Sequence, residues 1–303
     1  MSKRHAGHAG SWYSDNRDEL DKQLTKWLQA VTPAGELLPA CGVIAPHAGY
    51  SYSGPTAAYA YRHIDPSRVK RVFILGPSHH YHLTGCAVTR HKAYETPLGD
   101  LEIDAAVTAE LFSTGEFETM STEVDEEEHS IEMHLPYVYK AMAAARHSFT
   151  IVPVLVGSLT PEKERFYGQL FAQYLQDPAN FFVISSDFCH WGERFRYTYY
   201  NPAHGEIHES IAQLDKKGMD IIETQNPDTF LQYQQQFQNT ICGRHPIAVL
   251  LNSLKVLGLS RGPQKRAPYD LKFVRYAQSS PCKHQNDSSV SYASAVLRCE
   301  DKY

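Results

Sequence analysis

Short apolar runs alternate with helical patterns along most of this chain. Runs closed by Gly, Pro or Ser are typical of buried parallel strands. We expect three such strands to end at His47, near Leu75 and at Ser186, and a fourth over Phe149–Val156. Helical patterns fill the intervals, so strands and helices follow one another in turn. This order predicts an α/β fold in which helices cover both faces of a mostly parallel central sheet.

The predicted helices depend on apolar residues that recur at helical spacing. In the first helix, Leu20, Leu24 and Leu28 share one face. Ser14 or Asp15 is available as its N-cap. Further helices are expected over residues 104–112, 228–237 and 246–257, after Gly205, and from the acidic stretch 125–128 until Pro136 interrupts it.

Prolines and the last apolar runs complete the predicted order. A helix should begin near Gly54-Pro55, because proline suits the first helical position. Another should begin after Thr160, with Phe166, Leu170 and Tyr174 on its inner face. The last two strands, which we expect to pair antiparallel at the sheet edge, cover residues 271–277 and 290–297.

The composition is that of an ordinary globular protein. Hydrophobic residues make up 42% of the 303 positions and charged residues 21%. The length is near the ~250–300 residues at which a single core usually splits, and we find no linker within residues 40–299. We therefore expect one domain over residues 1–303.

Charge and hydropathy argue against several classes of partner. The net charge is −5 without a block of Lys and Arg, so we expect no nucleic-acid or anionic-membrane binding. No apolar run approaches the ~20 residues of a transmembrane helix, and residues 1–10 lack the apolar region of a secretory signal. The six cysteines are spread without a CxxC pair. Reduced thiols are therefore expected, in the cytoplasm or the nucleus.

The candidate chemistry lies where the predicted strands end. His47, His79 and Asp187 each follow an apolar run, and ligands of open α/β sheets bind beyond the carboxyl ends of such strands. Two His and a carboxylate are residue types that hold a divalent transition metal. His190 is a candidate acid/base at neutral pH. Alternatively, His47 and Asp187 have a structural role and form hydrogen bonds that cap a loop or turn. Because adjacent side chains of an extended segment point in opposite directions, His80 should point away from His79.

Cys242 is a candidate of another kind, because it precedes a predicted helix. A helix N-terminus lowers the pKa of a thiol, and a thiolate is both a soft metal ligand and a nucleophile. We expect Cys242 to be the most reactive of the six thiols when metal is absent; the alternative is a small buried hydrophobe. His129 and Glu132 share a helix face at i, i+3, and they either line the same pocket or lie on a solvated helix start.

Several familiar catalytic motifs are missing from the sequence. It contains no HExxH, G-x-S-x-G, Walker A or Rossmann glycine motif. We therefore expect no zincin, no hydrolase of the G-x-S-x-G type, no NTPase and no nucleotide cofactor.

Six blocks of this sequence resemble those of the Memo family, named for mediating receptor-kinase-driven cell motility. They occur in the order of the family and extend over nearly the whole chain. The blocks are His8–Tyr13, Ala45–Tyr50, Leu75–His80, Glu128–Glu132, Ser185–Trp191 and Cys242–Pro246.

The resemblance implies a fold similar to that of class III non-heme-iron extradiol dioxygenases, in which two His and a Glu hold Fe(II). His47 and His79 match the two ligand histidines, and His190 matches the acid/base. Cys242 stands where those enzymes have the Glu ligand. The resemblance therefore implies copper or iron, with one ion per chain, and redox effects. Ordinary ring cleavage is not expected, because a thiolate shifts the preference towards softer ions.

The resemblance also implies an adaptor role in cell motility. Memo proteins are associated with phosphotyrosine peptides of activated receptors and with actin and microtubule control. The expected partners are therefore phosphotyrosine-containing receptor or adaptor peptides and cytoskeletal regulators, and arginines suit bidentate contacts with a phosphate. The residues assigned to peptide or substrate binding are Trp12, Tyr52, His129, Glu132, Arg194 and Arg196.

Three interpretations remain open on the sequence. The first is a metal-binding redox protein in which Asp187 and His190 lie beside the ligands and fix the histidine tautomers. The second is a phosphotyrosine-peptide adaptor without enzymatic activity. The third is an active enzyme, either a metal-dependent oxidoreductase or a hydrolase with Cys242 as nucleophile.

Overall fold

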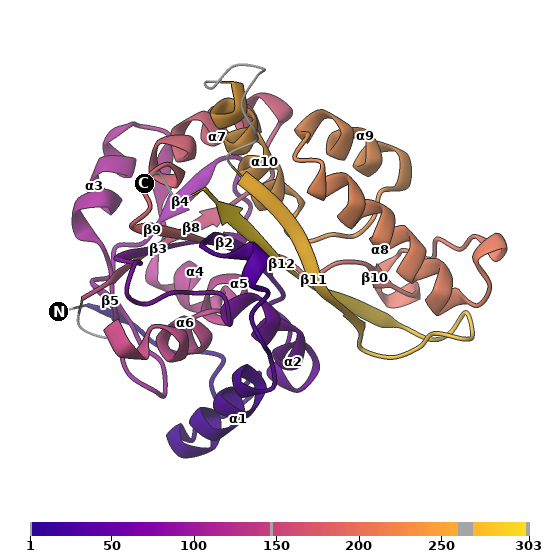
Figure 1. Cartoon of the computed structure of the whole chain (residues 1–303), viewed down its shortest axis with the longest axis horizontal. Coiled ribbons are helices and arrows are strands. Elements are labelled where there is room, and N and C mark those ends of the chain that lie inside the picture. The colour runs from indigo at the N-terminus through magenta and orange to yellow at the C-terminus, as the bar shows by residue number, and fades with distance from the viewer. Residues whose placement is uncertain (1, 146–147, 260–268, 301–303) are drawn as a thin grey trace.

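A large mixed sheet forms the centre of the molecule (Figure 1). The computed structural model describes residues 2–145, 148–259 and 269–300. The strands of this sheet are β2 (Ala40–Ala45), β3 (Arg71–Pro77), β4 (Cys86–Val88), β7 (Phe117–Thr119), β8 (Thr150–Val156), β9 (Asn180–Ser185), β10 (His190–Trp191), β11 (Tyr269–Gln278) and β12 (Ser289–Cys299). Their order is β10-β12-β2-β9-β3-β8-β4-β7, and β11 pairs with β12.

Four parallel strands, β2, β9, β3 and β8, lie in the middle of this order. Their register places Val43 and Ile74 on either side of Val183. β12 runs antiparallel to β2, and β11 runs antiparallel to β12. The predicted mostly parallel sheet with a late antiparallel pair is thus confirmed.

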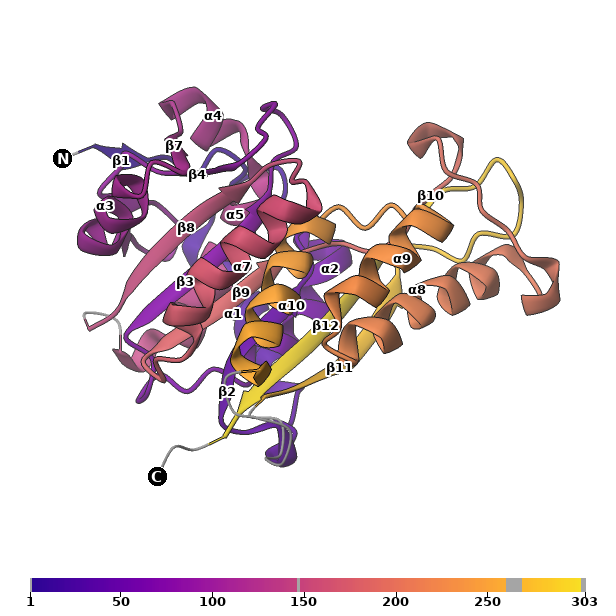
Figure 2. The same cartoon turned by 90° about the horizontal axis from the view of Figure 1, so that it is seen from above.

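Helices cover both faces of the sheet, as the alternation of elements predicted. The helices are α1 (Arg17–Gln29), α2 (Tyr50–Tyr61), α3 (Ala105–Ser113), α4 (Thr122–Glu127), α5 (His129–Glu132), α6 (Leu135–Ala141), α7 (Pro161–Leu175), α8 (Ile207–Glu223), α9 (Pro227–Phe237) and α10 (Arg244–Leu259). Single 3-10 turns occur at Gly35–Leu37, Ala143–Ala145, Glu193–Phe195 and Pro202–His204. Figure 2 shows α7 and α10 side by side, and their residues are in contact.

The period of two along each strand divides the core between the two faces. Phe73 and Leu75 pack on the side of α7, α8, α9 and α10. Val72 and Ile74, which alternate with them, pack on the side of α1, α2 and α6. Strands buried on both faces read as continuous apolar runs, which explains why the sequence revealed them.

Two helix starts differ from the prediction. The N-cap of α1 is Asn16, whose side chain accepts a hydrogen bond from the Glu19 amide, and not Ser14 or Asp15. α2 begins at Tyr50 and contains Pro55, so the start predicted near Gly54-Pro55 is wrong. Tyr50 is buried and its hydroxyl donates to the Met133 carbonyl at 2.7 Å. This tertiary contact favours a helix that begins before the proline.

The inner face of α7 is also displaced from the prediction. Tyr167, Phe171 and Leu175 are buried, whereas Phe166 is 39% exposed. The predicted stripe of Phe166, Leu170 and Tyr174 lies next to the buried stripe of Tyr167, Phe171 and Leu175, and both stripes are apolar. Gly168 decides between them, because a Cβ there would come within 2.4 Å of the Asn252 Cβ on α10. The face that contacts α10 therefore includes position 168 and the Tyr167 stripe.

The shortest strands were not predicted from the sequence. β4, β7 and β10 have two or three residues each. A second sheet consists of β1 (Lys3–Arg4), β5 (Ala93–Tyr94) and β6 (Leu101–Glu102). A strand of two residues is too short to produce a periodic pattern in the sequence. The single helix predicted from 125–128 to Pro136 is instead two short helices, α4 and α5, which meet at Glu128. The interruption predicted at Pro136 is confirmed as a restart, because α6 begins at Leu135 with the proline in its first turn.

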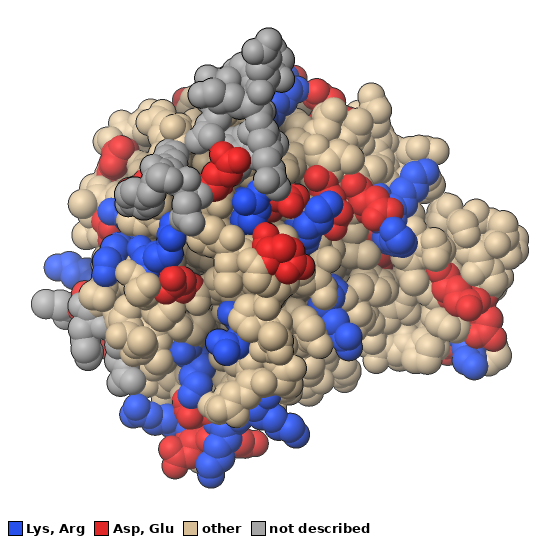
Figure 3. Space-filling view, viewed as in Figure 1, with Lys and Arg blue, Asp and Glu red and all other residues tan. Residues whose placement is uncertain are grey.

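The surface fits the balanced composition. On the face seen in Figure 3, Lys and Arg side chains are interspersed with Asp and Glu. None of the helices in the described ranges combines the length and apolar character needed to cross a membrane.

Candidate metal centre

Three polar side chains lie just beyond the ends of three neighbouring strands. His47 follows β2, Asp187 follows β9 and His79 follows β3, and these strands are adjacent in the sheet. Because the strands are parallel, the three residues meet at one edge. The common edge predicted from the sequence is therefore present.

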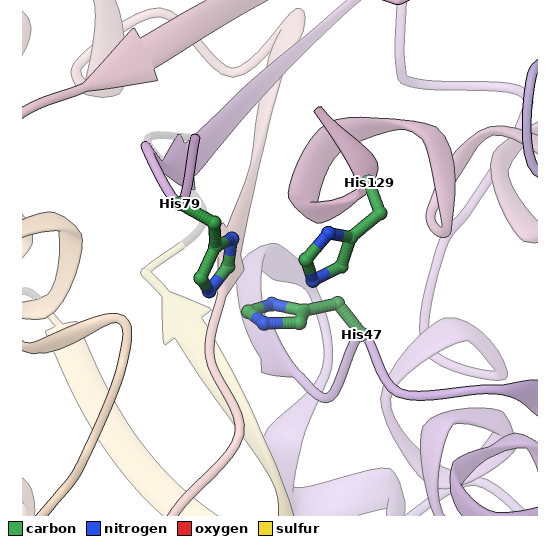
Figure 4. A group of neighbouring side chains, drawn as sticks. All are labelled: His47, His79 and His129. Carbon is green, nitrogen blue, oxygen red and sulfur yellow. The ribbon is translucent and has the colours of Figure 1, made fainter. Parts of the chain in front are cut away.

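His47, His79 and His129 form a compact group at this edge (Figure 4). One nitrogen of each ring lies within 4.8 Å of the others. The ring centres of His47 and His79 are 5.1 Å apart, and those of His79 and His129 are 4.3 Å apart. The rings point towards one another from the loops after β2 and β3 and from α5. A transition metal suits such a set of imidazoles.

Hydrogen bonds fix which nitrogen of His47 is available. The Ser185 hydroxyl donates its one hydrogen to the Ser130 carbonyl at 2.7 Å. It therefore acts as acceptor for His47 Nδ1, which lies 2.6 Å away. This arrangement places the ring proton on Nδ1 and leaves Nε2 as the ligand nitrogen.

His79 is oriented by a buried carboxylate. Glu128 Oε1 is 2.9 Å from His79 Nδ1, and Oε2 accepts from the His79 amide at 2.6 Å. A ligand histidine typically donates its second nitrogen in this way, which fixes the ring and its tautomer. His80, the next residue, is more exposed than His79, as the extended chain predicted.

The protonation states of the three imidazoles differ. Burial, with the neighbouring His79, lowers the pKa of His47 well below its usual range. Burial also lowers the pKa of His129 to about 3. For His79, burial is outweighed by hydrogen bonds with Cys242 and Glu128, which raise its pKa to about 10. The neutral rings of His47 and His129 are already in the form that binds a metal.

An orphaned nitrogen supports the fit of a metal to this site. His129 Nδ1 is buried and has no hydrogen-bond partner among the described residues. A buried polar atom without a partner is costly. The neutral imidazoles and the neighbouring thiol therefore match the donor set of a soft or borderline ion.

Cys242 lies next to the imidazoles, on the turn before α10. Its Sγ is 3.3 Å from His47 Nε2 and accepts a hydrogen bond from the Asp187 amide at 3.2 Å. Gly243 permits this approach, since a Cβ there would come within 2.3 Å of the Ser185 carbonyl oxygen. The structure thus brings Cys242 to the predicted place beside His47 and His79.

The expected lowering of the Cys242 pKa is wrong. Burial raises it above the usual value, although the contact with His79 acts in the opposite direction. α10 begins only at Arg244, and His245 turns away to Glu164 at 2.7 Å. The helix terminus and these neighbours therefore do not determine the thiol's charge. The charge of the thiol is determined mainly by its burial and by its contact with His79.

Asp187 and His190 flank the histidine group, and Asp187 Oδ2 lies 3.9 Å from His47 Nε2. Asp187 Oδ1 accepts from the His47 amide at 2.9 Å, so its carboxylate holds the loop that carries His47. Burial raises its pKa. His190 Nδ1 is 2.8 Å from the Phe188 carbonyl and 3.0 Å from that of Thr240. Because carbonyls only accept, Nδ1 carries the proton and Nε2 is the basic nitrogen.

A hollow of about 640 Å³ lies beside the histidines and contains three of the residues assigned to peptide binding. Trp12, Tyr52 and Arg194 line it together with five serines. Trp12 also stacks on His129, with ring centres 4.5 Å apart. The hollow and the imidazole group therefore share a wall.

Two other residues assigned to peptide binding lie elsewhere. Arg196 is not among the residues that line the hollow. Glu132 is fully buried. Its oxygens accept from the Tyr13 hydroxyl at 2.8 Å and from Arg4 Nη1 at 2.7 Å. Glu132 and His129 both lie against His8, but Glu132 contacts the buried Arg4 whereas His129 faces His47 and His79.

Arg4 is a residue that the sequence did not reveal. It is fully buried, and its Nε also pairs with Asp125 Oδ1 at 3.0 Å across 121 positions of sequence. Glu132, which Arg4 contacts, accepts from His8 as well. These bonds hold the N-terminal segment that carries Trp12 onto His129. No local signal marks Arg4, because its partners are distant in sequence.

Comparisons with known proteins confirm the resemblance that the six sequence blocks indicated. A family model described as Memo-like protein matches residues 4–296. The chain is 54% identical over 298 residues to Protein MEMO1 of Danio rerio, covering 98% of each chain. It is 53% identical over 295 residues to Protein MEMO1 of Homo sapiens, covering 97% of each chain. Protein memo-1 homolog of Caenorhabditis elegans is 50% identical over 296 residues, which cover 97% of this chain and 82% of that relative.

Proposed function

Since this chain belongs to the Memo family, we propose that it binds one copper or iron ion through His47, His79 and Cys242 and acts in redox control and signalling. The observation that carries the proposal is the convergence of the imidazoles of His47 and His79 on one thiol. Cys242 Sγ lies 3.3 Å from His47 Nε2, and His79 contacts the same thiol. His129 supplies a further imidazole within reach.

The donor set favours a soft ion over the chemistry of ring cleavage. A thiolate with imidazoles suits Cu(I), whereas the 2-His-1-carboxylate triad of oxygenases needs a carboxylate at the third position. Asp187 Oδ1 accepts from the His47 amide and its Oδ2 lies 3.9 Å from His47 Nε2, so the Cys242 thiol, at 3.3 Å, is nearer to this nitrogen than the carboxylate is. We therefore propose that ordinary extradiol turnover is weak or absent. His190, whose Nδ1 contacts two backbone carbonyls, would be the residue that holds or moves a proton beside the ion.

Anaerobic metal titration tests the ligand assignment. Wild-type protein should take up one equivalent of Cu(I) or Fe(II) per chain. His47→Ala and His79→Ala should each abolish tight binding, and Cys242→Ser should weaken Cu(I) more than Fe(II). His80→Ala is the matched control, because His80 is an exposed neighbour of the same type. Tight stoichiometric binding by the combined His47, His79 and Cys242 variant would place the ion elsewhere.

The hollow favours a second function, binding of a phosphotyrosine-containing receptor or adaptor peptide. Trp12 and Tyr52 offer exposed aromatic surface, and Arg194 offers a guanidinium to the phosphate. Serine hydroxyls complete a polar lining. In this role the protein acts in the cytoplasm, or also in the nucleus, and its further partners are cytoskeletal regulators.

Peptide titration with and without chelator separates this function from metal binding. Arg194→Ala should weaken a phosphotyrosine peptide and leave the unphosphorylated peptide unchanged. Arg196→Ala is the control, because Arg196 does not line the hollow. Equal losses in both variants would show that general charge, and not the hollow, attracts the peptide.

A further inference from the structure

Two cysteine side chains approach each other at the amino end of β2, away from His47. Cys41 lies in β2 and is buried, and Cys299 is the last residue of β12 and is only partly buried. The two thiols are within hydrogen-bonding reach of one another. Each also contacts the backbone of the other's segment: Cys41 Sγ is 3.6 Å from the Leu297 carbonyl, and Cys299 Sγ is 3.6 Å from the Pro39 carbonyl.

The pairing of the strands explains this approach. β2 and β12 are antiparallel, with Arg298 opposite Ala40 and Leu297 opposite Gly42. The register shift between these pairs makes Cys41 the extra residue of a bulge. Cys41 and Cys299 both pack into the core on the side of α7 and α10. They are therefore cross-strand neighbours on one face, the arrangement in which side chains of adjacent strands meet.

We propose that Cys41 and Cys299 form an oxidisable thiol pair, which a hydroperoxide converts into a disulfide between β2 and β12. This modification site is separate from the metal centre, which lies at the other end of β2. Cys299 is the entry point, since it is the more exposed of the two thiols. Cys41, which is shielded in the core, is the resolving partner.

The oxidation balances in two steps. The Cys299 sulfur attacks one peroxide oxygen, the O–O bond breaks, and the leaving oxygen takes up the thiol proton, so Cys299 becomes a sulfenic acid. The Cys41 sulfur then attacks the Cys299 sulfur, and hydroxide leaves with the Cys41 proton as water. The two thiols lose two electrons in total, and the hydroperoxide gains them. With hydrogen peroxide the products are one disulfide and two waters.

Burial makes the second step the slower one. It raises the pKa of the Cys41 thiol, and the neighbouring Cys299 adds to this effect. A protonated thiol is a poor nucleophile. A sulfenic-acid trap should therefore label Cys299 early in the reaction and Cys41 hardly at all.

Mass spectrometry of the oxidised full-length protein tests the proposal. The protein is treated with hydrogen peroxide in a buffer with chelator, which excludes metal-catalysed oxidation, and is then alkylated and digested without reductant. We expect one dominant linked species that joins the peptides of Cys41 and Cys299 and disappears on reduction. The oxidised protein should also melt roughly 5 °C higher, because the bridge spans almost the whole chain.

Matched variants identify the pair. Cys299→Ser should lose both the linked peptide and the melting shift, and its half-buried site makes misfolding a small risk. Cys86→Ser, at another buried cysteine, should retain both. The proposal is overturned if Cys41 stays alkylatable after unfolding while Cys299 is oxidised alone. It is equally overturned if urea-unfolded protein forms the same link as readily as native protein.

Discussion

Glu128→Gln is the sharpest perturbation of the metal centre that leaves every proposed ligand in place. The carboxylate accepts from His79 Nδ1 at 2.9 Å, from the His79 amide at 2.6 Å and from the Ser130 amide at 2.8 Å. Both oxygens are therefore occupied by N–H donors. Glutamine has nearly the same size, but one of its two terminal atoms is itself a donor.

The size of the effect follows from these contacts. Whichever way the glutamine amide is turned, at least one buried N–H faces another N–H, which costs about 1–3 kcal/mol. Even where the amide oxygen faces His79 Nδ1, this neutral acceptor holds the ring more weakly than the charged carboxylate does. Changes in such partners typically weaken metal affinity about 10–100-fold, which corresponds to about 1.4–2.7 kcal/mol.

The acid dependence of stability provides a second, independent readout. Burial alone would raise the pKa of Glu128, but the hydrogen bond to His79 prevails and lowers it from 4.5 to about 2. The folded state thus binds this proton less readily than the unfolded chain. The stabilisation is complete above pH 4.5 and is lost as the pH falls towards 2, with a total of about 3 kcal/mol. The variant lacks this part of the acid dependence.

The assay is competition for Cu(I) and Fe(II) against a chromophoric chelator under anaerobic conditions, together with urea unfolding between pH 3 and 7. Glu127→Gln is the control, since its side chain is 64% exposed and its nearest histidine, His80, is 3.9 Å away. That control should remain within about 0.5 kcal/mol of the wild type. Wild-type metal affinity in Glu128→Gln would refute the orienting role of the carboxylate.

Three further changes test other parts of the molecule. Arg4→Met should lower the free energy of unfolding by about 3–5 kcal/mol in urea titrations, because two buried carboxylates lose their partner; Lys3→Met, at the exposed neighbour, should leave the unfolding curve nearly unchanged. Ser185→Ala removes the acceptor for His47 Nδ1 and should weaken metal binding about 10-fold in the chelator competition; unchanged affinity would show that the hydroxyl does not select the tautomer. Burial raises the pKa of Asp215 from 3.8 to about 6, so the folded state holds this proton more tightly than the unfolded chain. Stability should therefore fall by about 3 kcal/mol as the pH rises through this interval, and a persistent fall in Asp215→Asn would assign it to another group.

The sequence predicted those parts of the fold that have a long period or a clear boundary. β3, β8 and β9 have six or seven residues each, and burial on both faces makes them continuous apolar runs. Strands of two or three residues give no such pattern. The face of α7 was misplaced because two adjacent stripes are apolar, and only the contact of Gly168 with α10 separates them.

Some residues of the candidate site could likewise be predicted from the sequence, and others could not. His47, His79 and Asp187 could be found because each follows a recognisable strand, and parallel strands end at one edge. His129 belongs to a short helix whose position depends on the tertiary fold. The sequence left open whether His129 lines the same pocket or lies on a solvated helix start, and the fold decides for the pocket.

Electrostatics was the least predictable property of the site. The position of Cys242 before a helix suggested a lowered pKa, but burial in the folded protein raises it. The buried pairing of Arg4 with Glu132 connects residues that no local pattern relates. Such effects depend on which groups share a low-dielectric interior, and the sequence alone does not specify this.

X-ray absorption spectroscopy of the anaerobically Cu(I)-loaded protein identifies the ligands of the ion, because it reports the atoms bound to the metal. We expect one copper per chain, with imidazole nitrogens and one sulfur in its coordination shell. The sulfur contribution should vanish in Cys242→Ser and persist in Cys282→Ser. A shell without sulfur in the wild-type protein, or a sulfur signal that survives in Cys242→Ser, would contradict ligation by His47, His79 and Cys242.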